Sequence, residues 1–235
     1  MVLRLVLALT LGAIWSAATL AAERAPREQL ARMSDALRSL SYEGTLVYLH
    51  DNKLETLRIA HRVEDGQVRE QLISLNGPVR TVTREKGKVT CQLSNSRPIS
   101  VPGHGVRRDL LNTRAIDPTV LAEHYLVHPL GAARVAGRQT DVVGIVPRDG
   151  LRYGHRLYLD RESGLPLKSD LMGQDSHPIE QIMFTSLQLL SMGEGPPPAA
   201  VPAAESPRRD VVVQVPDSVP WRFVELPAGF ALVMH

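Results

Sequence analysis

The chain has 235 residues, of which 43% are hydrophobic and 22% are charged, and its formal net charge at pH 7 is +2. So balanced a charge gives no general electrostatic attraction to nucleic acid, and we expect no nucleic-acid partner. The single cysteine, Cys91, excludes an internal disulfide, so the fold must depend on its hydrophobic core.

Residues 1–22 have the pattern of a secretory signal peptide. Arg4 precedes an uncharged apolar run over residues 5–15, and Ala21 and Ala22 mark the expected cleavage point. The run is shorter than the roughly 20 apolar residues that a membrane span needs. We therefore expect export to the periplasm with a cleavable leader, and an uncleaved anchor is the alternative.

The mature chain is expected to begin with a helix over residues 26–40, because Leu30, Met33, Leu37 and Leu40 recur at spacings of three and four. Period-two alternation between turn residues then predicts a series of strands. These strands are expected over residues 42–50, 55–63, 67–75, 79–85 and 88–94.

A loop is expected over residues 97–111, which contain two prolines and two glycines. Asp117 and Pro118 are a typical N-cap and first residue of a short helix that continues to about Tyr125. Four strands joined by tight turns are predicted next. They are expected over residues 139–147, 151–160, 165–172 and 179–189.

This order of elements predicts an α+β fold, a large antiparallel sheet with helices packed on one face. Several strands carry apolar residues on both faces, as where Ile182 and Phe184 alternate with Met183. Two explanations remain open. The second face is buried by helices and a neighbouring domain, or it forms an apolar concave surface that accepts a lipid tail.

The composition changes after the last predicted strand. Residues 191–218 are rich in proline and glycine and are expected to form an extended linker, so the first domain spans residues 23–190. Residues 219–235 are expected to be the truncated start of a second domain, because so short a segment cannot close a core alone.

The sequence contains no recognisable motif for catalysis, a metal or a cofactor. His124 and His128 would share one face of a helix, but Pro129 disfavours helix at that point, so we expect two solvent-facing histidines rather than a metal site. We expect no cofactor and no enzyme activity. A hydrolase whose Asp, Glu and His residues meet only in space remains the alternative.

Several segments, in order along nearly the whole mature chain, resemble the MucB/RseB family. The resemblance is carried by residues 39–48 (SLSYEGTLVY), 75–80 (LNGPVR), 134–138 (RVAGR), 147–157 (PRDGLRYGHRL), 164–171 (GLPLKSDL), 219–221 (VPW) and 226–230 (LPAGF). No single segment is a sharp motif, but their order and spacing make the match fairly specific.

This resemblance implies a periplasmic negative regulator of an envelope-stress sigma factor. Family members bind the periplasmic part of a RseA/MucA-like membrane anti-sigma factor and protect it from proteolysis, and lipopolysaccharide or lipoprotein acyl chains are thought to release it. The resemblance also implies a first domain similar to the lipoprotein carriers LolA and LppX, an unclosed half-barrel. A periplasmic carrier of lipid or lipoprotein is the alternative function.

Two groups of residues are candidates for binding. The first lines the expected lipid site with inward apolar side chains, for which plain core packing is the alternative: Leu57, Ile59, Leu157, Leu159, Leu167, Leu171 and Met183. The second consists of aromatic residues in the final segment that need a partner or domain to contact: Trp221, Phe223 and Phe230.

Overall fold

The computed structural model describes residues 26–78, 80–86, 88–93, 99–102, 118–191, 226–228 and 230. The expected signal peptide and almost all of the expected linker lie outside these residues. Neither described helix is long and apolar enough to cross a membrane.

The described elements form two series, and each series consists of one helix followed by several strands. A helix over residues 26–39 precedes six strands, which are β1 (Ser41–His50), β2 (Lys53–Glu64), β3 (Gln67–Ser74), β4 (Arg80–Glu85), β5 (Lys88–Leu93) and β6 (Ile99–Pro102). The short helix α2 (Pro118–His124) precedes five more, which are β7 (Tyr125–Val135), β8 (Arg138–Pro147), β9 (Gly154–Asp160), β10 (Pro166–Met172) and β11 (Pro178–Leu190).

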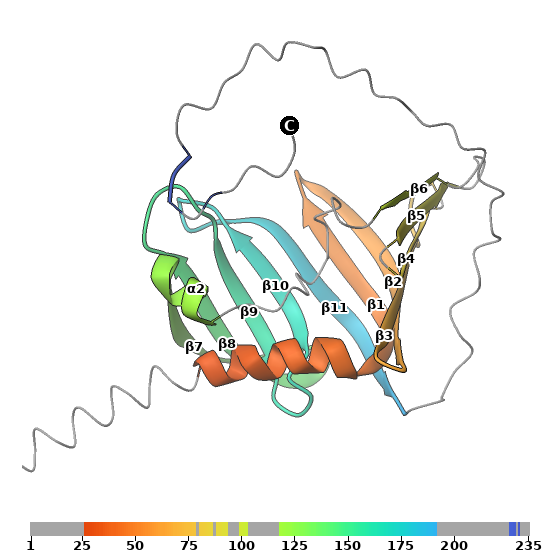
Figure 1. Cartoon of the computed structure of the whole chain (residues 1–235), viewed down its shortest axis with the longest axis horizontal. Coiled ribbons are helices and arrows are strands. Elements are labelled where there is room, and N and C mark those ends of the chain that lie inside the picture. Colours follow the sequence, from red (N-terminus) through yellow and green to blue (C-terminus); the bar gives the residue numbers. More distant parts are fainter. Residues whose placement is uncertain are drawn as a thin grey trace, which may run out of the picture.

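All of these strands form one antiparallel sheet in the order β6-β5-β4-β3-β2-β1-β11-β10-β9-β8-β7. Each series is a meander, and the first and last of the described strands, β1 and β11, meet in the centre of the sheet (Figure 1). The end strands β6 and β7 do not pair with each other, so the sheet is not closed into a barrel. The predicted large, unclosed antiparallel sheet is therefore confirmed.

Two strands were not predicted. The expectation of a loop over residues 97–111 is wrong for β6, whose four residues pair with β5, for instance Cys91 with Ile99. The sequence also gave no sign of β7, which contains Pro129 and a register shift between Pro129 and Gly131. Proline removes a ladder donor, and β7 accommodates it because among the described strands it pairs with β8 alone.

The joint between β1 and β11 holds the two meanders together. The register runs from Ser41 opposite Leu190 to His50 opposite Glu180, with a shift between Thr45 and Leu46. Beside that shift the strands approach so closely that a Cβ on Gly44 would lie 2.2 Å from the backbone oxygen of Ser186. Only glycine fits this position without moving a strand.

One face of the sheet is here called the inner face. It carries Leu46 and its cross-strand partners Leu57 and Phe184, together with the residues whose side chains point to the same side of the strands. Leu30, Met33 and other apolar residues of the N-terminal helix share one buried cluster with these side chains. The helix crosses the inner face near one end of the strands (Figure 1). That both helices pack on one face stays a prediction, since α2 contacts mainly β7.

A buried carboxylate fixes the turn between β9 and β10. Asp160 accepts two hydrogen bonds from the Arg138 guanidinium, at 2.9 and 2.8 Å. It also accepts bonds from the Ser163 backbone N–H at 2.9 Å and hydroxyl at 2.7 Å. Burial alone would raise the pKa of Asp160, but these bonds outweigh it and hold the pKa below its ordinary value of 3.8.

The first prediction concerns the close approach at the centre of the sheet. Gly44→Ala should lower the free energy of unfolding by about 2–4 kcal/mol, because the new methyl group meets the backbone of β11. Gly150→Ala is the matched control, since a Cβ there meets nothing within 4 Å. Urea denaturation measures both, and equal stabilities for the two variants would contradict this view of the joint.

The second prediction concerns acid sensitivity. Because the pKa of Asp160 is depressed in the folded state, its stabilisation is present above the unfolded pKa and is lost as pH falls below about 4. Asp160→Asn should cost about 2 kcal/mol at pH 7, and the gap to the wild type should narrow in acid. Exposed Asp65→Asn should cost nothing measurable. A gap independent of pH, in denaturation curves from pH 7 to pH 3, would refute the proposed linkage.

Candidate functional site

The structure brings six of the seven lipid-lining candidates to the inner face. Leu57 pairs with Leu46. The remaining five lie on β2, β9 and β10, and their side chains point to the same side of the sheet as Leu46. Met183 does not join them. It pairs with Lys168, whose neighbours in the strand, Leu167 and Ser169, point to the other side of the sheet, so Met183 lies on the opposite, outer face.

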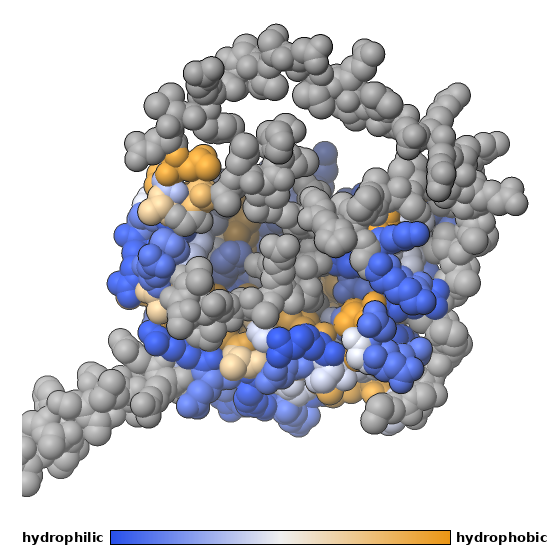
Figure 2. All heavy atoms as spheres, viewed as in Figure 1, coloured by the Kyte–Doolittle hydropathy of each residue, from blue (hydrophilic) through white to orange (hydrophobic). Residues whose placement is uncertain are grey.

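Five of these six side chains are solidly packed. Leu57, Ile59, Leu157, Leu159 and Leu167 are each at most 8% exposed and belong to the cluster that includes the N-terminal helix. Leu171 lies farther along β10 and is half-buried. Figure 2 shows apolar side chains within the hollow of the inner face and hydrophilic side chains over much of its lower edge and sides. The helix thus occupies the part of the inner face where most of the candidates lie.

A polar group is buried beside this apolar core. The rings of Tyr42 and His61 stack with centroids 4.7 Å apart, and His61 Nδ1 lies 3.4 Å from a carboxylate oxygen of Glu70. Arg84 contacts the other Glu70 oxygen at 3.3 Å. Burial, and secondarily the charge of Glu70, raises the pKa of Tyr42. Tyr42 therefore remains protonated, and the cluster serves to connect β1 with β2, β3 and β4.

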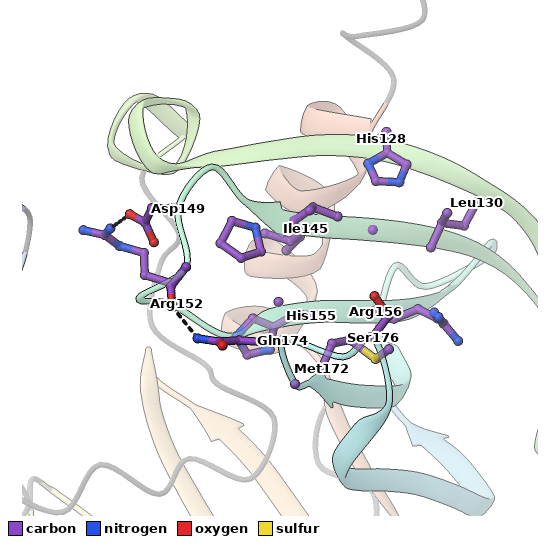
Figure 3. A pocket seen from close by; sticks show the side chains of 16 residues that line it. His128, Leu130, Ile145, Asp149, Arg152, His155, Arg156, Met172, Gln174 and Ser176 are labelled. Atoms are coloured by element: carbon purple, nitrogen blue, oxygen red, sulfur yellow. Dashed lines mark hydrogen bonds and ion pairs between the residues drawn. The ribbon is translucent and has the colours of Figure 1, made fainter.

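The outer face carries a groove of about 430 Å³, which we call the outer groove. It lies over β7, β8 and β9 and beside the turn after β10, with the N-terminal helix behind the strands (Figure 3). Its lining includes His128, Leu130, Gly144, Val146, Gly154, Arg156 and Met172. Sequence reasoning missed this site. The signal that could have found it is the pair of glycines, Gly144 within the apolar run of β8 and Gly154 at the start of β9.

Only one aromatic partner candidate can be placed. Phe230 lies under the Arg152 guanidinium, whose carbon is 4.6 Å from the ring centroid, and Arg152 also donates to the Ala228 carbonyl. The segment around residue 228 therefore contacts the turn between β8 and β9, beside the outer groove. Trp221 and Phe223 lie outside the described residues, and their role stays a prediction.

The two histidines that were considered as metal ligands lie on different elements. His124 ends α2, whereas His128 is in β7 with its ring against Gly144, since a Cβ there would lie 3.0 Å from it. His128 is half-buried and lines the outer groove, which is open to solvent. Within the described residues, no three His, Cys, Asp or Glu side chains are grouped as a metal site requires.

Known proteins are similar to this chain in sequence and in fold. The family model of the MucB/RseB N-terminal domain matches residues 25–209. The sigma factor AlgU regulatory protein MucB of Pseudomonas aeruginosa is 35% identical, over 86% of this chain and 63% of that protein. A crystal structure of MucB superposes with a TM-score of 0.62 at 37% identity, covering 74% of this chain and 61% of MucB.

A solved complex of Pseudomonas aeruginosa MucA and MucB also matches, with a TM-score of 0.58 at 37% identity, over 72% of this chain and 58% of that one. The chain therefore spans less than two thirds of the length of these relatives. The structure of Mycobacterium tuberculosis LppX is also matched, with a TM-score of 0.44 at 10% identity, over 72% of this chain and 94% of that one. Because the family model matches residues 25–209, which is most of the sequence, the chain belongs to the MucB/RseB family.

Proposed function

We propose that this protein is a periplasmic regulator that binds the periplasmic part of a membrane anti-sigma factor. The observation that carries the proposal is the similarity to MucB, which was solved in complex with MucA, at 37% identity over 72% of this chain. In this proposal the bound chain shields the anti-sigma segment from proteolysis and so keeps its sigma factor silent.

Location and chemistry are part of the same proposal. The apolar run behind Arg4 and the alanines at positions 21 and 22 would direct the chain through the inner membrane. The protein then acts by binding and not by catalysis. In support, the related proteins are named as regulators of sigma factors.

Lipid sensing would work through the N-terminal helix. Leu30, Met33 and Leu37 cover the apolar residues that were expected to line a lipid site. An acyl chain could reach those residues only by taking the place of this helix, and the exchange would alter the shape of the inner face. Half-buried Leu171 lies beyond the helix and offers the acyl chain a first contact. Binding of lipid would thus be coupled to release of the anti-sigma segment.

The third prediction tests the binding proposal. The purified chain should bind the periplasmic segment of its own anti-sigma factor with a dissociation constant in the micromolar range or below, about −8 kcal/mol, measured by titration calorimetry. The complex should also slow cleavage of that segment by a purified periplasmic protease. The control is a segment of the same composition in scrambled order. Absence of binding to the native segment would refute the proposed function.

The fourth prediction tests the packed state of the inner face. Leu167→Ala should lower the free energy of unfolding by about 2–4 kcal/mol, because its side chain is fully buried under the helix. Leu171→Ala should cost about 1 kcal/mol or less. Thermal and urea denaturation without lipid compare the two variants. A similar, small cost for both would show that the helix does not close this part of the inner face, and lipid could then enter without displacing it.

A further inference from the structure

Two glycines of neighbouring strands, Gly144 and Gly154, line the outer groove. A Cβ on Gly144 would lie 3.0 Å from the His128 ring and from Leu130, and one on Gly154 would lie 3.1 Å from the backbone oxygen of Ile145. The His128 ring and Leu130 of β7 therefore already lie against the backbone of Gly144 and form this side of the groove. A side chain at either glycine would have to displace these neighbours and would narrow the groove.

The rim of the groove exposes apolar side chains. Val146 is 44% exposed and Leu130 46%, and Leu126, which pairs with Val146, is 48% exposed. Met172 stands across from them on the far wall. Apolar side chains gathered around a groove indicate an interaction surface more strongly than the same residues scattered over the protein would.

The groove also presents a positive charge. Among the described residues, the Arg156 side chain lines the groove and has no ion-pair or hydrogen-bond partner. The neighbouring Arg152 is already held by Asp149 and by the Ala228 carbonyl. A partner that brings a carboxylate to Arg156 would gain a charge-assisted hydrogen bond that the free protein does not make.

The strand at the rim adds a backbone contribution. Among the described strands, β7 is the end strand of this half of the sheet. The backbone groups on its outer edge are available to an extended chain running alongside, in the manner of strand addition.

We propose that the outer groove receives an extended stretch of the anti-sigma segment, with apolar side chains between Leu130 and Met172 and one acidic side chain on Arg156. This inference rests on the proposed function and specifies where and in what form the partner binds. It assigns binding to the face opposite the N-terminal helix, so that partner and lipid occupy different faces of the sheet.

Charge reversal tests the assignment. Arg156→Glu should weaken binding of the anti-sigma segment at least tenfold, through loss of the ion pair and repulsion of the acidic side chain. Arg58→Glu is the matched control, because Arg58 is an exposed arginine of β2 on the same outer face and the change in charge is equal. It should stay within twofold of wild type. Circular dichroism melts establish that both variants fold.

Site-directed photo-crosslinking tests the same point in an otherwise unaltered chain. A benzophenone side chain at Val146 should crosslink to the anti-sigma segment, and one at Leu54, which is 58% exposed at the start of β2, should not. If the wild-type chain binds the segment but position 146 does not crosslink and both arginine variants bind equally, the groove assignment is wrong while the proposed function stands. If the wild type does not bind, the proposed function itself fails.

Crosslinking without the anti-sigma segment distinguishes two other occupants. A crosslink from position 146 to residues 231–235 of the same chain, or to a second copy, would show that the groove is filled by the protein itself, and would overturn the assignment.

Discussion

The pairing of β1 with β11 is the constraint on which the rest of the structure depends. These strands come from opposite ends of the domain, and their ten-residue register converts two separate meanders into one sheet. Loop closure over such a distance is entropically costly, so the contacts at the joint must be close and well packed. Gly44 makes the close approach possible, and Phe184 and Leu46 supply the apolar contact beside it.

Most of this fold is readable from the sequence because the turns are explicit. Asp65-Gly66, Asn76-Gly77 and the glycine at 164 place the hairpins, and glycines 66, 77 and 164 all have positive φ. The strands that were missed lack such local signals. β6 is four residues long, and β7 interrupts its alternation at Pro129 and Gly131, so only tertiary pairing with β5 and β8 makes them strands.

The candidate site was harder to predict, for a physical reason. Alternation places Leu57, Ile59, Leu157, Leu159, Leu167 and Leu171 on one face, but it cannot say whether a helix or a ligand covers them. The outer groove is lined by residues of β7, β8, β9 and β10 and of the turn at residues 173–177, which are far apart in the sequence. Such a site gives no periodic pattern in the sequence, and only the register of β8 against β9 brings its residues together.

The two faces of the sheet therefore have different tasks in this account. The N-terminal helix covers one end of the inner face, and the outer face carries the groove proposed for the partner. Hydrogen exchange of the chain with and without the anti-sigma segment tests this division most directly. The account predicts slower exchange in β7 and in the turn at residues 173–177, with the helix at residues 26–39 unchanged. Slower exchange confined to that helix and the inner-face strands beneath it would contradict it.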